Sequence, residues 1–389
     1  MHLDLVPSHL LALLDCVRPA RGHAKLNPVL GAALLRVRQG ALEAAATNLD
    51  VSLQTRLPLE GFAPEDTPLC AVPLDECRAA VAALAREDIL TLTTTETRMV
   101  VAGGRARYTL PLLRDASWPN LLADEAEVPV PTALTGAALA RLLRHVLPAA
   151  DEPRPGAGPL AGVHLRPSGT ALIAAATNRY LFLRTILPDA VGDGAMAPVT
   201  IPVVSAEQIA ATFADVGALT LGVTPLTHVL VIRSQHTEYA CRVFADPYPD
   251  VETLWARVTE TAPAATVTFP LAQCDAALAQ VMALAQVVRH KASPVELTFG
   301  EETRLRYGVE DVGASQTTLH SLAGTGEPGM RYQVNGEYLS RALTSAALVP
   351  SGEEPPVVRL GGDGGKRPLR LSLLGEAHWG AFIAPTGVS

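Results

Sequence analysis

The amino-acid sequence predicts an α+β protein built from three similar units, each with two helices and antiparallel strands. A short phrase, AAATN, occurs at residues 44–48 and returns 130 residues later at 174–178. Each copy lies in an alternating apolar run, 42–53 and 172–183, which is typical of a β-strand. Helical and strand-pair patterns recur at nearly the same offset, so the chain reads as a threefold repeat.

Two helices are expected in each unit. The first carries leucines or small apolar residues at i, i+3 and i+4 spacing, over residues 10–17, 139–147 and 276–285. The second follows a β-favouring residue and a turn-compatible residue, over residues 74–84, 205–214 and 338–348. Paired alternating runs follow each second helix, at 89–95 with 99–110, 219–223 with 228–244, and 357–360 with 369–383.

Unit boundaries are expected where loop residues interrupt these patterns. Units one and two end in similar phrases, SWPNL at 117–121 and PYPDV at 247–251. We therefore expect an N-terminal domain over 1–124, a central domain over 125–257 and a C-terminal domain over 258–389.

The amino-acid composition excludes several classes of protein. The chain has 31 basic and 39 acidic residues, a net charge of −8, and its 48% hydrophobic content is enough for several cores. Aromatic residues make up only 4%, which disfavours a binder that stacks single-stranded bases. No apolar run reaches the ~18 residues of a membrane span, and the start lacks a basic signal-peptide region. A cytoplasmic protein is expected, with reduced thiols at Cys16, Cys70, Cys77, Cys241 and Cys274.

Signatures of catalysis and of metal binding are missing from the sequence. There is no HExxH, GxSxG or Cys/His metal spacing. The glycine-rich stretch at 360–367 lacks the first glycine and the final Ser or Thr of a phosphate-binding loop, so a hairpin turn is expected there. We expect a protein that is not an enzyme and holds no cofactor or metal.

Several phrases, in order and at family-like spacing, resemble the bacterial sliding clamp, the beta subunit of DNA polymerase III. They are NPVL at 27–30, ATNL at 46–49, VP at 72–73, WPNL at 118–121, ATN at 176–178 and PD at 249–250. The resemblance covers the whole chain. It implies three domains, each with two helices on a curved antiparallel sheet, and two chains closed head-to-tail into a ring.

The resemblance implies that the helices line a channel for duplex DNA, held through phosphates and without sequence preference. Basic residues cluster on or after those helices, which reconciles DNA binding with the acidic balance. They are Arg18, Arg21, His23, Lys25, Arg78, Arg86, Arg141, Arg144, Arg289, Lys291 and Arg341. The alternative is that they cap helix ends and form surface ion pairs.

A groove for peptides of polymerases and the clamp loader is also implied, between the second and third domains. Its matching positions are Leu160, Thr177, Asn178, Arg179, Tyr180, Leu181, Pro249, Leu254, Phe382, Ile383, Ala384, Pro385 and Thr386. The family's glycine-containing TDGHRL phrase is here the shorter TNRYL, and its methionine-rich end is here APTGVS. Fewer methionines predict a shallower groove that Tyr180 and Phe382 partly fill, with weakened partner binding.

The ring contact is implied at a first-domain edge strand and a third-domain helix. The matching residues are Arg105, Arg107, Tyr108, Leu110, Leu284 and Ala285. Tyr108 and Leu110 share a strand face and could form an apolar seam, or Tyr108 could pack inside its own domain.

The sequence is compatible with three functions. The first is a processivity clamp that tethers replicative or repair polymerases. The second is a divergent clamp paralogue that serves repair, regulation or a mobile element. The third is an α+β enzyme with a chance repeat.

Overall fold

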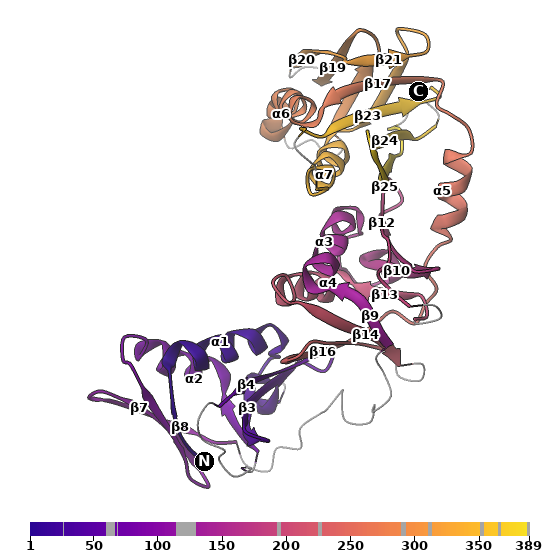
Figure 1. Cartoon of the computed structure of the whole chain (residues 1–389). Coiled ribbons are helices and arrows are strands. Elements are labelled where there is room, and N and C mark those ends of the chain that lie inside the picture. Colours follow the sequence, from indigo (N-terminus) through magenta and orange to yellow (C-terminus); the bar gives the residue numbers. More distant parts are fainter. Residues whose placement is uncertain are drawn as a thin grey trace. The chain divides into compact units, whose positions relative to one another are not determined.

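The computed structural model describes residues 1–25, 27–59, 67, 69–113, 130–192, 196–224, 228–288, 293–309, 313–350, 354–364 and 367–386 (Figure 1). These residues form two compact units. Unit 1 comprises Met1–Gly136 and Asp215–Val243, and unit 2 comprises Ala137–Ala214 and Phe244–Ser389. Each unit is described by itself.

Unit 1 packs two helices against antiparallel strands. The helices are α1 (Pro7–Val17) and α2 (Leu74–Ala83), which lie side by side in Figure 1. A four-stranded sheet has the order β1 (His2–Leu5), β6 (Leu90–Thr94), β7 (Arg98–Gly103), β8 (Ala106–Pro111). An eight-stranded sheet has the order β5 (Cys70–Pro73), β2 (Ala32–Arg38), β3 (Ala41–Thr47), β4 (Val51–Pro58), β16 (Thr237–Arg242), β15 (Val229–Arg233), β14 (Ala218–Thr224), β9 (Val130–Thr135). Leu10 and Leu14 of α1 are fully buried, so the core lies beneath this helix.

Unit 2 is built in the same way. Its helices are α3 (Gly136–Val146), α4 (Val203–Thr212), α5 (Val251–Thr259), α6 (Leu271–Val288) and α7 (Gly336–Ala347). A nine-stranded sheet has the order β13 (Val199–Pro202), β10 (Gly162–Ser168), β11 (Ala171–Thr177), β12 (Leu181–Leu187), β25 (Glu376–Ile383), β24 (Leu369–Leu373), β23 (Val357–Gly362), β17 (Ala265–Pro270), β21 (Ala323–Thr325). A four-stranded sheet has the order β20 (Gly313–His320), β19 (Glu302–Val309), β18 (Pro294–Thr298), β22 (Arg331–Asn335). Helices α6 and α7 pack together, and α6 contacts β19 and β20.

The two long sheets are antiparallel throughout and join strands far apart in sequence. β4 pairs with β16 in unit 1, and β12 pairs with β25 in unit 2. Each pairing connects a strand of one predicted repeat to a strand of the next. The central repeat, predicted over 125–257, therefore contributes strands to both compact units. The division into three domains stays a prediction.

The repeated AAATN phrase forms the same turn twice. The Thr47 hydroxyl donates to the Val51 carbonyl at 2.8 Å, and the Thr177 hydroxyl donates to the Leu181 carbonyl at 2.9 Å. In both turns the Asn side-chain oxygen accepts backbone N–H groups two and three residues later. These bonds fix a tight connection between consecutive strands, because Asn and Thr side chains replace missing backbone partners.

Both turns contain a non-glycine residue in the left-handed region. Leu49 has φ +81° and Arg179 has φ +80°. A side chain there costs roughly 1–2 kcal/mol, because its Cβ crowds the backbone. The repeat therefore preserves a strained conformation at equivalent positions, and the surrounding side-chain hydrogen bonds hold it.

The α+β prediction is confirmed, and each expected helix is present within a few residues of its expected bounds. The glycine-rich stretch at 360–367 lies at the connection between the paired strands β23 and β24. Its residues 365 and 366 lie outside the described residues. Helix α5 has no counterpart among the expected helices. No helix among the described residues is long and apolar enough to cross a bilayer.

Replacing Arg179 with glycine should stabilise the fold, because glycine adopts a positive φ without a Cβ clash. We expect the free energy of unfolding to rise by about 1 kcal/mol, measured by chemical denaturation. Tyr180→Gly is the matched control, since the neighbouring residue has no positive φ. A lower stability for Arg179→Gly would show that this turn is not strained.

Candidate functional site

An aromatic cluster holds helix α5 against one face of the nine-stranded sheet. The Trp255 ring centroid lies 4.8 Å from that of Phe382 and 6.0 Å from that of Phe182. Phe182 and Phe382 are register partners on β12 and β25, so their side chains point to the same face. Stacked aromatic pairs add stability beyond the area they bury. The cluster fixes α5 across the β12–β25 border.

Charged groups secure the same helix. Arg184 donates from Nε and Nη2 to the two carboxylate oxygens of Glu252, both at 3.1 Å. Its guanidinium lies 4.9 Å from the Trp255 ring centroid. Arg166 adds a 3.1 Å ion pair to Glu252. A bidentate pair at a buried arginine is strong and directional, so α5 has little freedom to shift along the sheet.

The segment that leads into α5 is fixed by Tyr248. Its ring stacks on His164 with centroids 4.9 Å apart and planes 7° apart. The Tyr248 hydroxyl accepts the N–H of Thr177 at 2.9 Å, which ties α5 to the TNRYL turn. Burial, followed by the charge of Arg166, lowers the pKa of His164 to about 4. The imidazole is therefore neutral at physiological pH.

The expected groove positions do not share one face of the sheet. Leu181 and Ile383 are register partners and fully buried, whereas Phe382 points to the opposite face beneath α5. Phe382 therefore cannot fill a groove lined by Ile383, and this part of the expectation is corrected. The misassignment arises because consecutive strand residues alternate between faces. Leu160 is also buried.

The exposed groove positions gather around the TNRYL turn and α5. Tyr180 is 58% exposed and stacks on Tyr338 of α7, with ring centroids 6.1 Å apart. Arg179 and Pro249 are exposed, and Leu254 is 41% exposed. The chain after β25 then crosses this region.

Backbone hydrogen bonds hold that last stretch. Ala384 donates to the Tyr180 carbonyl at 2.7 Å, and Thr386 donates to the Gln333 carbonyl at 2.8 Å. Pro385 forms an isolated bridge with Val334. The positions expected from the family's methionine-rich end therefore lie beside the turn, in a small-residue strand-like segment.

Several of the expected DNA-contacting residues on α1 and α2 are ion-paired. Arg18 pairs with Asp75 at 3.5 Å, and Arg21 pairs with the same carboxylate. Arg78 donates from Nη2 to Asp15 at 3.2 Å. These pairs join α1 to α2 and offset part of the positive charge.

The remaining expected cations differ in their surroundings. Arg341 pairs with Glu337 and lies 5.9 Å from the Tyr338 ring centroid, and Arg144 donates to the Ala210 carbonyl at 2.9 Å. Four side chains are exposed and form no salt bridge with any other described residue: His23, Lys25, Arg86 and Arg141. Arg289 and Lys291 lie outside the described residues.

The strand expected at the ring contact is a sheet edge, and Leu284 of the expected helix lies beside another edge strand. β8 is the outer strand of its sheet, and Tyr108 and Leu110 are half-buried while Arg105 and Arg107 are exposed. In unit 2, Leu284 lies beside the start of the edge strand β20, but Ala285 is buried in its own core. The strand β20 itself was not identifiable from the helix pattern.

Metal-binding clusters and reactive thiols have little support among the side chains of the described residues. No group of three or more His, Cys, Asp or Glu side chains in this part of the chain is placed to hold a metal ion. Burial raises the pKa of Cys70 to about 11 and that of Cys77 to about 12, so both remain protonated thiols.

Comparison with known proteins identifies the family. No family model matches the sequence. The beta sliding clamp of Vibrio harveyi is 33% identical over 134 residues, which are 33% of this chain and 88% of that protein. The chain belongs to the beta sliding clamp family. The beta sliding clamp of Vibrio cholerae is 33% identical over 147 residues, 37% of this chain and 38% of that clamp.

Solved structures extend this family likeness to the whole fold. The DNA polymerase III subunit beta of Pseudomonas aeruginosa aligns over all of both chains with a TM-score of 0.87 at 19% identity. The DNA polymerase sliding clamp of Bacillus subtilis aligns as completely, with a TM-score of 0.86 at 16% identity. This beta-clamp family member thus keeps the clamp fold with a strongly diverged sequence.

The neutral, half-buried His164 should make this clamp-family fold acid-sensitive. Its folded pKa lies below the unfolded value of about 6.5, so the unfolded state binds more protons as the pH falls. The contribution of the neutral His164 to the free energy of unfolding should therefore be fully present above about pH 6.5. It should decrease as the pH falls toward 4. Thermal unfolding across this range should show a flatter decline for His164→Phe than for wild type.

His236→Phe, at an exposed ring, is the control and should follow the wild-type decline. An NMR titration midpoint for His164 near 6.5 would contradict the assignment.

Proposed function

We propose that two copies of this chain close head-to-tail into a ring that encircles duplex DNA in the cytoplasm. The ring tethers DNA polymerases and is itself non-catalytic. The single observation that carries the proposal is a pair of complementary sheet edges, β8 and β20. Family membership and the fold likeness over all of this chain support it.

The complementarity follows from the repeat. β4 and β12 occupy equivalent places, since both directly follow the TN turn, and each pairs with a strand of the next repeat, β16 or β25. By order in the repeat, β20 is the equivalent of β4 and β12, and β8 is the equivalent of β16 and β25. Within the sheets of the described residues, β8 and β20 end their sheets without such a partner.

The pairings β4–β16 and β12–β25 each join two consecutive repeats. Pairing of β8 of one copy with β20 of another would therefore be the third contact of this kind. An edge strand exposes unpaired N–H and C=O groups that favour pairing with another strand. The contact is heterologous, so it either closes into a ring or propagates, and two copies satisfy both edges at once. Val287 of α6 is 80% exposed near this end of unit 2 and would add apolar area.

The DNA-facing part of the proposal rests on the paired helices of each repeat. The exposed cations Lys25 and Arg86 follow α1 and α2, and neither forms a salt bridge with another described residue. Phosphate contacts carry no sequence information, so such cations would hold a duplex while allowing it to slide.

A second function, a divergent paralogue with its own partners, is favoured by one observation. Leu181 and Ile383 are fully buried where an apolar partner groove was expected, while the more polar Tyr180 is exposed. Fluorescence anisotropy with a labelled polymerase-derived clamp-binding peptide separates the two functions. Binding abolished by Tyr180→Asp indicates a polymerase clamp, and no binding alongside an intact ring indicates the paralogue.

The wild-type chain should behave as a dimer of about twice its 40.9 kDa mass in size-exclusion chromatography with light scattering. Leu110→Asp should give monomers, because the β8–β20 contact would bury an unpaired carboxylate. His2→Asp places the same charge on β1, the opposite edge of that sheet, and should remain dimeric. A monomeric wild type at micromolar concentration would refute the ring.

Lys25→Ala combined with Arg86→Ala should weaken duplex binding equally for unrelated sequences. The slope of log affinity against log salt should fall by up to about 1.8, near 0.9 for each lost phosphate contact. Arg38→Ala with Arg359→Ala removes two exposed strand arginines and serves as the control. An unchanged slope in the first variant would place its cations away from DNA.

A further inference from the structure

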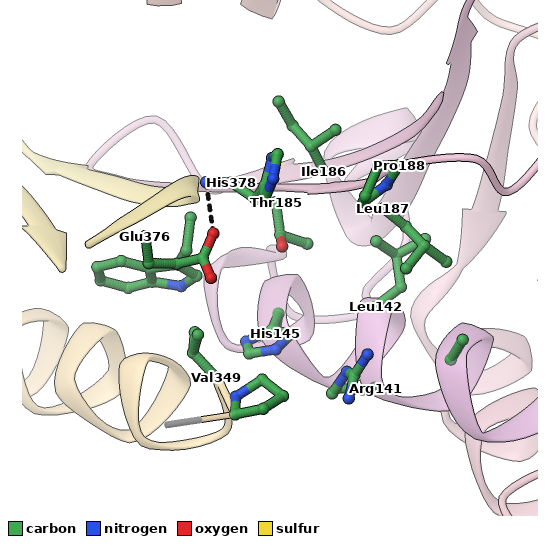
Figure 2. A pocket seen from close by; sticks show the side chains of 13 residues that line it. Arg141, Leu142, His145, Thr185, Ile186, Leu187, Pro188, Val349, Glu376 and His378 are labelled. Atoms are coloured by element: carbon green, nitrogen blue, oxygen red, sulfur yellow. Dashed lines mark hydrogen bonds between the residues drawn. The ribbon is translucent and has the colours of Figure 1, made fainter. Parts of the chain in front are cut away.

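An open cavity of about 180 Å3 lies at the surface of unit 2, between α3, the end of β12, the segment after α7 and the start of β25 (Figure 2). It is separate from the expected partner groove. The groove residues Leu181 and Ile383 pair at one end of the β12–β25 border, and Thr185 pairs with Trp379 four positions further along. That distance is roughly 13 Å along the strands.

The cavity brings opposite charges together without pairing them. Arg141 and His145 project from α3, across from Glu376 and His378 of β25 (Figure 2). Glu376 accepts the backbone N–H of His378 at 2.8 Å. No ion pair within the described residues joins Arg141 to Glu376, although both line the same space. A cation and an anion are thus left facing a shared, partly apolar cavity.

Hydrogen bonds connect the elements at the floor of the cavity. His145 is buried and donates from Nδ1 to the Ser345 carbonyl at 3.0 Å, which leaves Nε2 as an acceptor. The Ser345 hydroxyl donates back to the His145 carbonyl at 2.6 Å and accepts the Trp379 indole N–H at 2.9 Å. A network that connects α3, α7 and β25 holds the cavity open in advance, which lowers the entropic cost of binding.

Apolar side chains form the other wall, chiefly Leu142, Ile186 and Val349. The cavity is large enough for a medium-sized side chain with its polar groups at the rim. A guanidinium binds a carboxylate through two parallel N–H groups, and a carboxylate or imidazole acceptor binds an N–H. The site therefore complements a ligand that combines a carboxylate, an adjacent N–H and an apolar side chain.

We propose that this cavity binds an apolar α-amino carboxylate, anchored by its carboxylate at Arg141 and by its N–H at Glu376. A free amino acid and the C-terminal residue of a peptide share this chemistry. Arg141 is then a ligand-binding residue rather than a DNA contact. Because the walls come from α3 and β12 on one side and α7 and β25 on the other, the ligand would also stabilise their packing.

Isothermal titration of the 389-residue chain with L-leucine, N-acetyl-L-leucine and L-leucinamide tests the proposal. Binding of either carboxylate, with leucinamide at least tenfold weaker, is the expected result. Binding of N-acetyl-L-leucine identifies a peptide C-terminus as the ligand, and binding of L-leucine alone identifies a free amino acid. Arg141→Gln and Glu376→Gln should each weaken the binding about tenfold.

Arg144→Gln is the matched control, one turn further along α3 and outside the cavity lining. It should bind the ligands like wild type, and an Arg141→Gln thermal unfolding midpoint equal to that of wild type excludes misfolding as the cause. The proposal is overturned if neither carboxylate binds, if leucinamide binds equally well, or if Arg141→Gln leaves the affinity unchanged.

Discussion

Pairing of edge strands between consecutive repeats is the interaction on which the rest of this structure depends. β4 and β16 align from Val51 opposite Cys241 to Thr55 opposite Thr237, and the two threonine hydroxyls add a 3.1 Å hydrogen bond. Backbone groups at a sheet edge need partners, so each repeat finds them in the next one. The same requirement applies to β8 and β20, which end their sheets and which the proposed ring would join. The α5 cluster reinforces the one border between repeats that lies in unit 2.

The parts of the fold that were predictable from the sequence are those encoded locally. The TN phrase identified the repeat correctly because its threonine and asparagine side chains make the turn through hydrogen bonds within four residues. The helices were predictable for a similar reason, since their apolar spacing is a property of consecutive turns. The strained residues Leu49 and Arg179 directly follow the two copies of the phrase, but neither residue type indicates a positive φ.

The parts that were not predictable depend on residues distant in sequence. Helix α5 spans only nine residues and owes its position to Phe182, Phe382 and Arg184, which lie on two separate strands. The face on which Phe382 lies is set by its register with β12, not by its neighbours. The cavity beside Arg141 likewise needs α3 and β25 to meet, and the sequence gives no spacing that connects them.

The ion pairs on α1 and α2 change how a net charge of −8 can be reconciled with a duplex in the proposed ring. Arg18 and Arg21 reach Asp75 across the two helices, and Asp75 is 44% exposed. Exposed pairs of this kind contribute at most about 1 kcal/mol, so a phosphate can compete with the carboxylate for the same guanidinium. In the proposed ring, this exchange of a carboxylate for a phosphate would make each DNA contact weak. A ring that moves along a duplex needs many weak contacts rather than a few strong ones, because strong contacts would hold it at one position.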